Sequence, residues 1–329
     1  MNKNVYFPHR PGSIGGPSSF QKRLEFKLIQ NGYKVFYAND SNNVVSNFSS
    51  VVIVVGGTKK IFWLIKCKIN GFKIIHRLDG IHDYQFNFKD GVKSFVKSRL
   101  IHFMINFIRR FLADHVVYQS NYVKNIWEIY GGKLKNTSVI YNAVNLNEFF
   151  PVEKNAKSSE FSIVAVEGTV QGELALRALK SMTSIKINVY GRVHKMIKNA
   201  LQISNNKNVI LHGSIPREDI PKIFVGKKIY LCLEINPACP NSVIEALAAG
   251  VPVVGFNSGS LLELVGDAGV ILPLENAGFK NFKDDDFKAL NLAIEKIVGD
   301  YDYYSTLART RSEKFYNLDD QFLKYKDLF

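Results

Sequence analysis

The chain has 329 residues, 46% hydrophobic and 22% charged, a composition typical of a globular protein long enough for two α/β domains. No apolar run approaches the roughly 18 residues that a spanning helix needs. The first residues enter a strand-like run without the apolar stretch of a signal peptide, so we expect a cytoplasmic protein. Three cysteines without metal-ligand spacing, Cys67, Cys232 and Cys239, predict reduced, packed thiols.

The net charge of +14 is concentrated in the first half of the chain. Residues 1–150 hold 21 Lys and Arg against 8 Asp and Glu, whereas the remainder holds 22 against 21. A basic half beside a neutral half predicts an anionic partner for the first half, either a membrane surface or nucleic acid.

Apolar runs in the first half alternate with segments of helical period, which is the pattern of a parallel sheet covered by helices. The predicted strands lie near Val5 and at 33–37, 51–55, 72–76, 115–118 and 138–141. A helix is predicted over 19–31, where Phe20, Leu24 and Leu28 share a face and Gly32 ends the element.

The segment between Gly91 and His115 mixes large apolar residues with Lys and Arg at helical spacing. One interpretation is a helix packed on the first sheet with a solvated basic face. The other is a basic amphipathic helix that lies on an anionic membrane. Both interpretations stay open at this point.

The second half repeats the alternation, with strands predicted at 162–166, 187–190, 209–211, 229–233, 251–255 and 270–272. Residues 149–159 lack periodicity and contain Pro151, which predicts a linker. After Asp284 the pattern is helical, and the acidic run 284–286 is interpreted as a helix start rather than a metal site. We therefore predict domains over 1–150 and 151–312, with a last helix over 313–329 that packs back on the first domain.

The most informative stretch contains two predicted helix starts, at 241–242 and 258–260, each directly beyond a predicted strand. Ligands of open α/β sheets bind at such strand ends, and helix N-termini present N–H groups to anions. Amides near Asn241 and Ser242, and a second set at Ser258, Gly259 and Ser260, would suit a diphosphate. The alternative is that Ser-x-x-Glu at both starts is merely a capping box.

Three segments together resemble glycosyltransferase family 4: 241–263, 139–149 and the glycine-rich loop 12–16. The resemblance implies a GT-B fold, which is an α/β architecture of two Rossmann-like parallel-sheet domains that face each other across a cleft. It also implies that Glu245, the second Glu of a Glu-x7-Glu signature, binds the donor ribose. The amides of Asn241, Ser242 and Val243 would then face the phosphates or the sugar, and Ser214 and Ile215 of the loop 213–216 would contact the base through their backbone.

The chain departs from the family pattern at two places. Pro237 stands eight residues before Glu245, where the family has its first Glu, and the Arg and Lys that clamp the diphosphate are absent from 167–173. A departing diphosphate needs a cation in the transition state. Arg192, next to Gly191 at a strand end, is our candidate, with Lys195 second; the alternative is a solvated charge at a helix start.

Two further polar clusters lie at strand ends of the first half. Gly15 and Gly16 resemble the family's loop that closes over donor and acceptor, whereas the dinucleotide spacing G-x-G-x-x-G is absent. His76, with Asp79 as its partner, would orient an acceptor hydroxyl or the transferred sugar. The alternative for this cluster is an Asx-type turn beside an incidental His.

The resemblance implies a retaining glycosyltransferase that needs no metal and no cofactor apart from its nucleotide-sugar donor. The acceptor would be a hydroxyl of a glycan or lipid-linked acceptor in bacterial cell-surface polysaccharide synthesis. The charge of the basic half, in turn, predicts peripheral contact with an anionic membrane at its inner face. A second hypothesis is a catalytically silent glycosyltransferase-like subunit, because the first Glu and the Arg/Lys pair are missing. A nucleic-acid-binding module is the third, but the chain has no recognisable reading element for nucleic acid, and we expect none as a partner.

Overall fold

The computed structural model describes residues 4–12, 15–38, 50–81, 92–151, 162–170, 172–182, 184–226, 229–274 and 282–329. The chain forms two compact units: unit 1 comprises 1–142 and 318–329, and unit 2 comprises 143–317. The sequence-based boundaries at 150 and 312 lie near these two transitions. Most of the predicted linker 149–159 lies outside the described residues.

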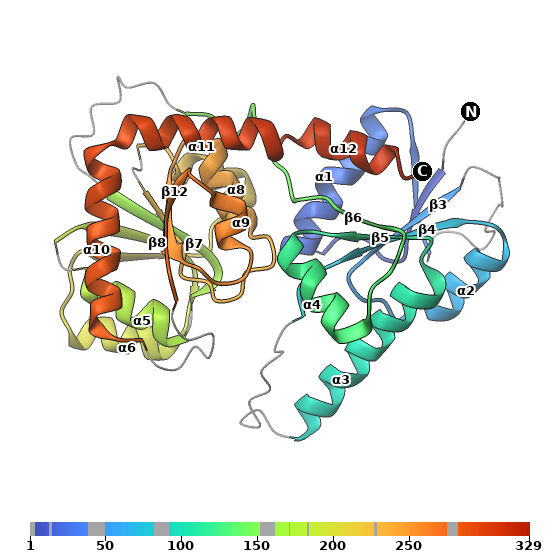
Figure 1. The fold of residues 1–329 in the computed structure, drawn as a ribbon, viewed down its shortest axis with the longest axis horizontal. Helices are drawn as coiled ribbons and strands as arrows, with labels where there is room; N and C mark the ends of the chain where they lie inside the picture. Colours follow the sequence, from blue (N-terminus) through green and yellow to red (C-terminus); the bar gives the residue numbers. More distant parts are fainter. Residues whose placement is uncertain are drawn as a thin grey trace. The chain divides into compact units, whose positions relative to one another are not determined.

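Unit 1 is built on a parallel six-stranded sheet in the order β2-β1-β3-β4-β5-β6 (Figure 1). Its strands are β1 (Asn4–Phe7), β2 (Lys34–Tyr37), β3 (Val51–Val55), β4 (Lys73–Leu78), β5 (His115–Tyr118) and β6 (Thr137–Val139). Its helices are α1 (Gly16–Gln30), α2 (Ile61–Ile69), α3 (Val92–Phe107), the π-helix η2 (Ile108–Leu112), α4 (Asn121–Gly131) and α12 (Leu318–Lys326). All six predicted strands of the first half are therefore confirmed.

The two faces of this sheet are covered by different helices. Phe20, Leu24 and Leu28 of α1 pack with Phe322 and Tyr325 of α12 on one face. On the other face, α2 and η2 bury an apolar cluster that includes Leu64, Cys67, Ile108 and Leu112. The Phe20 and Tyr325 ring centroids are 5.4 Å apart, which confirms that the last helix returns to the first sheet.

Unit 2 holds a second parallel sheet in the order β12-β11-β10-β7-β8-β9. Its strands are β7 (Ser162–Val170), β8 (Lys186–Val193), β9 (Val209–Gly213), β10 (Ile229–Leu231), β11 (Val253–Phe256) and β12 (Gly269–Leu272). Its helices are α5 (Gly172–Ser181), α6 (Lys195–Ile203), the 3-10 helix η3 (Arg217–Asp219), α7 (Ile220–Ile223), α8 (Asn241–Ala248), α9 (Leu261–Val265), α10 (Asp284–Gly299) and α11 (Tyr301–Phe315). The six strands predicted for the second half are also confirmed.

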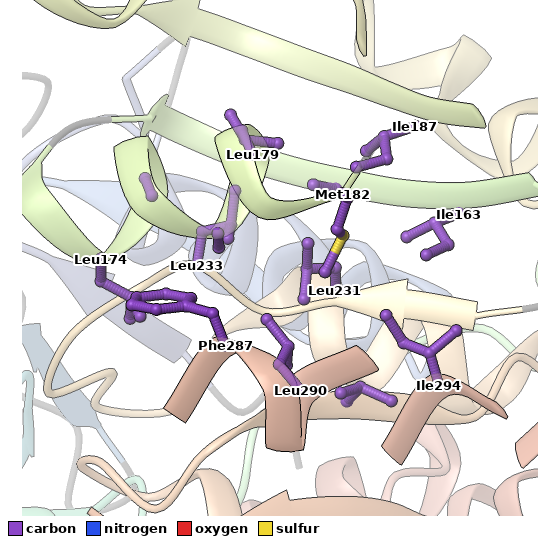
Figure 2. Close-up of a cluster of buried hydrophobic side chains, with 14 of the residues drawn as sticks. Ile163, Leu174, Leu179, Met182, Ile187, Leu231, Leu233, Phe287, Leu290 and Ile294 are labelled. Carbon is purple, nitrogen blue, oxygen red and sulfur yellow. The ribbon is translucent and has the colours of Figure 1, made fainter. Parts of the chain in front are cut away.

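The core of unit 2 lies between the sheet and helices α5 and α10 (Figure 2). Phe287, Leu290 and Ile294 of α10 follow the i, i+3, i+7 spacing that places side chains on one helix face, and all are buried. They meet Ile163 and Leu231 from the sheet. Each such side chain contributes about 1.5–3 kcal/mol of burial free energy, so this face fixes α10 on the sheet.

Two further expectations concern local chemistry. The acidic run 284–286 forms the first turn of α10, and Asp286 Oδ2 accepts a hydrogen bond of 2.8 Å from the backbone N–H of Lys283, so the predicted helix start is confirmed. The three cysteines are free and buried. Among the described residues no helix is long and apolar enough to cross a membrane.

Candidate functional site

In both sheets the strand order reverses beside the first strand: successive strands are added on one side of it and then on the other side. In unit 2 it runs from β7 outward to β8 and β9 and then returns to β10 on the other side of β7. In unit 1 the corresponding reversal lies between β1 and β3. Loops beyond the carboxyl ends of two such strands diverge and leave room for a ligand, so both reversal points are candidate sites.

The start of α8 lies directly after β10, at the reversal point of unit 2. The helix begins at Asn241 after Pro240, and no side chain caps it. Ser242 is therefore the second helical residue, and the alternative interpretation of a capping box does not hold at this start. The Ser242 hydroxyl instead lies 2.9 Å from the Tyr230 hydroxyl, which is 3.0 Å from the Val166 carbonyl oxygen.

The start of α8 has the general features that favour an anion at a helix N-terminus. The first N–H groups of a helix, here those of Asn241, Ser242 and Val243, have no acceptor within the helix, and the helix dipole adds positive potential there. Helix α11 fixes the other end of α8, because Arg309 Nη1 donates to the carbonyl oxygen of Ala248 at 2.8 Å. The sequence-predicted amides are thus held together on one rigid element.

Glu245 is buried on the same helix, with 2% of its surface exposed. Its Oε1 atom lies 3.4 Å from Arg217 Nη2, which makes a loose ion pair. A buried carboxylate requires such a partner, because an isolated charge is strongly disfavoured in the interior. Arg217 opens η3, two residues after Ile215, so the pair brings Glu245 beside the loop that contains Ser214 and Ile215.

Sequence reasoning missed Arg217. Its position directly after the loop 213–216 was the available signal, whereas the predicted cations, Arg192 and Lys195, lie at the end of β8 and the start of α6. Arg192 lies exposed on β8, beside Thr169 of β7, and β7 separates it from β10. Its role as the diphosphate cation stays a prediction.

The second predicted helix start serves a different purpose from the first. The Ser260 backbone N–H donates to the Pro237 carbonyl oxygen at 2.8 Å, and the Ser260 hydroxyl donates to the same oxygen at 2.9 Å. The prediction that the Ser260 amide faces a ligand is therefore wrong, because the protein's own chain occupies it. Helix α9 has no side-chain cap either, so the capping box predicted at 260–263 is also wrong.

Gly259 explains how this loop reaches the preceding one. Its φ of +61° is a left-handed conformation, and a Cβ at this position would lie 2.5 Å from the backbone of Pro237. The Ser258 hydroxyl accepts a 2.6 Å bond from the N–H of Asn236. The loop 257–260 therefore braces the segment before α8, and the packing of Gly259 accounts for its identity without a ligand.

A carboxyl group joins β7 to the segment that follows β10. Glu167 Oε1 accepts a 2.9 Å bond from the N–H of Leu233. Burial raises the pKa of Glu167 well above its usual range, and the nearby Glu234 carboxylate raises it further. A raised pKa favours the neutral form of this carboxyl, and the neutral form would limit the negative charge that a bound anion meets.

In unit 1 the structure corrects the predicted partnership of His76 and Asp79. His76 is fully buried in β4, and its Nε2 lies 2.8 Å from the carbonyl oxygen of Gly56. Burial lowers the pKa of His76 to about 4, and the Arg109 charge contributes. Asp79 instead pairs with Arg77, so the predicted His76–Asp79 pair is wrong, and the burial of His76 does not support contact with a substrate.

Arg77 forms hydrogen bonds to residues that follow three different strands. Its Nη1 bonds Asp79, which follows β4, while Nη2 donates to Gln119 Oε1 at 2.7 Å after β5 and to Asn142 Oδ1 at 2.8 Å after β6. The guanidinium carbon also lies 4.1 Å from the Phe20 ring centroid. Arg77 is 1% exposed, whereas the Asp79 side chain is 26% exposed, so the network presents one carboxylate at the surface of the sheet edge.

The strand ends at the reversal point of unit 1 are also linked. His9 Nε2 lies 2.7 Å from the Thr58 hydroxyl, and the Gln21 side-chain amide donates to the His9 carbonyl oxygen at 2.8 Å. Gly15 caps the N-terminus of α1, and Gly16 is its first residue. The two glycines thus lie where the chain turns from β1 into α1, as predicted.

Comparisons with known proteins agree with this fold. Residues 163–312 match the family model described as glycosyl transferases group 1. A segment of 59 residues is 36% identical to the O-antigen chain mannosyltransferase B of Escherichia coli and covers 18% of this chain and 16% of that protein. The chain therefore aligns with only a small part of that relative.

Solved structures match over nearly the whole chain. Sucrose-phosphate synthase from Thermosynechococcus elongatus superposes with a TM-score of 0.76 at 16% identity, covering 99% of this chain and 98% of that one. The Anabaena protein HepE, in its complex with UDP-glucose, gives 0.73 at 14% identity and covers 98% of each chain. The protein thus has the GT-B fold of two Rossmann-like domains, and the fold and the family match together support a glycosyltransferase.

Proposed function

We propose that the protein is a retaining glycosyltransferase of the family 4 type, which transfers a sugar from a nucleotide-sugar donor to a hydroxyl of a glycan or lipid-linked acceptor. The start of α8 carries this proposal, because no side chain caps this helix and its first residues, 241–243, stand directly before the buried Glu245 on the same element. The name of the E. coli relative supports a role in cell-surface polysaccharide synthesis.

In this proposal the amides of Asn241, Ser242 and Val243 hold the donor diphosphate, and the helix dipole stabilises the charge that develops on it during transfer. Glu245 accepts hydrogen bonds from the ribose hydroxyls, and Arg217 keeps its carboxylate in place. Backbone groups of Ser214 and Ile215 contact the base. Gly259 acts indirectly, since it braces the segment before α8.

We further propose Asp79 as the carboxylate on the acceptor side and Arg192 as the cation that reaches the diphosphate. Gly15 and Gly16 would let the backbone of unit 1 approach the donor closely. The reaction would use neither a metal nor a cofactor, because the departing phosphate oxygen can take the acceptor's proton. His76 supports the sheet beneath Asp79 rather than contacting substrate.

One observation favours a second candidate, a catalytically silent subunit that binds a nucleotide or glycan. Pro237 is buried, and its carbonyl oxygen is bonded to Ser260, at the position where family 4 has its sugar-binding Glu. A chain that binds a nucleoside diphosphate but neither transfers nor hydrolyses the sugar would fit this candidate.

The test begins with a thermal-shift screen against UDP, GDP, ADP, CMP and dTDP, in which a ligand that binds only the folded protein raises the melting temperature. UDP is the first nucleotide to test, since it is bound by HepE. Calorimetric titration of the best ligand into Glu245→Gln should show roughly tenfold weaker binding, because the amide cannot form the charge-assisted bonds of the carboxylate. Glu263→Gln on the neighbouring α9 is the matched control and should bind like the wild type.

Incubation with the corresponding nucleotide sugars then separates the two candidates. Release of free sugar or transfer to an acceptor supports the enzyme, whereas binding without turnover supports the silent subunit. The donor site itself would be wrong if no nucleotide shifts the melting temperature, or if Glu245→Gln binds as tightly as the wild type.

A further inference from the structure

Helix α3 of unit 1 exposes an apolar stripe. Val96, Leu100 and Phe103 follow the i, i+4, i+7 spacing that places side chains on one face of a helix, and they are 57%, 59% and 66% exposed. Arg99 is exposed beside them. Single exposed apolar residues are ordinary, but a row of three with an adjacent cation is the pattern of a surface that meets an apolar partner.

Helix α2 repeats this pattern. Phe62 and Ile69 are seven residues apart on one face and are 88% and 80% exposed, and the exposed Lys66 lies between them. Its opposite face is buried through Leu64 and Cys67. The helix therefore has one apolar face that packs on the sheet and a second that faces outward.

The two stripes belong to the same layer of unit 1. Helix α2 packs against η2, the continuation of α3, in one apolar cluster on the sheet face opposite α1 and α12 (Figure 1). Phe111 of η2 is 67% exposed, and its ring centroid lies 5.3 Å from that of the partly buried Phe107. Helix α2 and the helix formed by α3 and η2 thus lie on the same side of the sheet, and both expose apolar side chains.

The positive charge of unit 1 indicates which kind of partner binds this face. Unit 1 contains 23 Lys and Arg against 10 Asp and Glu, whereas unit 2 contains 20 against 19. A second copy of unit 1 would bring like charges together. Nucleic-acid bases could stack on Phe62 and Phe103 but not on the aliphatic Val96, Leu100 and Ile69, which a bilayer would bury as well. Apolar side chains interspersed with cations match a bilayer whose surface carries anionic headgroups.

We propose that the outward face of α2 and α3 docks unit 1 on an anionic lipid bilayer, with Phe62, Ile69, Leu100 and Phe103 entering the headgroup region. This inference does not depend on the proposed transfer reaction. Composition predicts an anionic partner for the first half of the chain as a whole. The proposal narrows its binding surface to two helices of unit 1 and places none of that surface on unit 2.

The test is flotation of the full chain with phosphatidylcholine vesicles, with and without phosphatidylglycerol. The wild type should float with the anionic vesicles, and high salt should weaken the binding. Two double variants test the two stripes: Leu100→Ser/Phe103→Ser and Phe62→Ser/Ile69→Ser. The affinity of each for the anionic vesicles should be lower than that of the wild type by a factor of about ten or more. Leu292→Ser/Val298→Ser on α10 of unit 2, where both residues are exposed, is the control and should bind like the wild type.

Tryptophan fluorescence establishes that each variant of unit 1 is folded, and nucleotide binding provides a readout independent of the membrane. Failure to float with anionic vesicles, equal binding to neutral ones, or unchanged binding by both stripe variants would overturn the proposal. Tighter binding to duplex DNA or to poly(U) than to the vesicles would assign the basic surface to nucleic acid and would also overturn it.

Discussion

The two sheets place polar groups at their carboxyl edges in opposite ways. In unit 1 the edge is built from side chains, since buried Arg77 bonds Asp79, Gln119 and Asn142 from three different strand ends. In unit 2 backbone groups take a larger part: the first turn of α8, the Ser260 N–H bonded to the Pro237 carbonyl oxygen, and the N–H groups of Leu233 and Asn236, which donate to side chains. The hydrogen bonds of an edge built from side chains depend on which residues are present. Those of an edge built from backbone groups depend on the conformation of the chain.

This difference predicts different sensitivities. Removal of a charged side chain should lower the stability of unit 1 more than that of unit 2, because the buried polar groups of unit 1 would lose a hydrogen-bond partner that water cannot replace. A residue that disturbs backbone conformation should damage unit 2 most. Both tryptophans, Trp63 and Trp127, belong to unit 1, so their fluorescence follows the unfolding of that unit alone.

The largest effect is expected for Arg77→Met. This change removes the guanidinium donor from the buried Gln119 and Asn142 and the cationic partner from Asp79, which should cost about 3–5 kcal/mol of the unfolding free energy of unit 1. Urea titration followed by tryptophan fluorescence measures it. Lys324→Met on the exposed face of α12 is the control and should change stability by less than about 0.5 kcal/mol. A loss for Arg77→Met no larger than that of the control would show that the network does not hold the edge.

The next effect concerns the buried His76. Its pKa of about 4 in the folded state lies below the unfolded value near 6.5, so the unfolded chain binds a proton first as the pH falls. The stability that the neutral imidazole contributes is complete above pH 6.5 and is lost as the pH falls toward 4, by about 3 kcal/mol. His76→Gln should lack this part of the pH dependence in the same fluorescence assay. Identical pH profiles for the two proteins would indicate an accessible, substrate-facing imidazole.

A conformational effect should dominate in unit 2. Gly259→Ala places a Cβ against the Pro237 backbone at a φ of +61°, which should destabilise unit 2 by about 2 kcal/mol and weaken nucleotide binding. Gly299→Ala at the end of α10, where no heavy atom lies within 4 Å of the added Cβ, should be neutral or stabilising by up to about 1 kcal/mol. Calorimetry measures both. Equal melting temperatures for the two variants would contradict the bracing role of Gly259.

The contrast between the edges also explains what could be predicted from the sequence. Strands were predictable because each is an apolar run such as 51–55, and the start of α8 was predictable because its amides come from consecutive residues. The partners of Arg77 lie 42 and 65 residues away along the chain, so no local pattern indicated them. Ser260 was misinterpreted because its acceptor, Pro237, belongs to another loop, and the orientation of His76 into the core is decided by packing rather than by its neighbours in sequence.

The central claim is that the first turn of α8, and not that of α9, holds the diphosphate. Hydrogen–deuterium exchange of the full chain with and without a saturating nucleoside diphosphate tests it directly. We predict slower exchange at the amides of 241–243 when the nucleotide is bound, with little change at Ser260, whose N–H is already bonded to the protein. Protection at 258–260 with none at 241–243 would contradict the account.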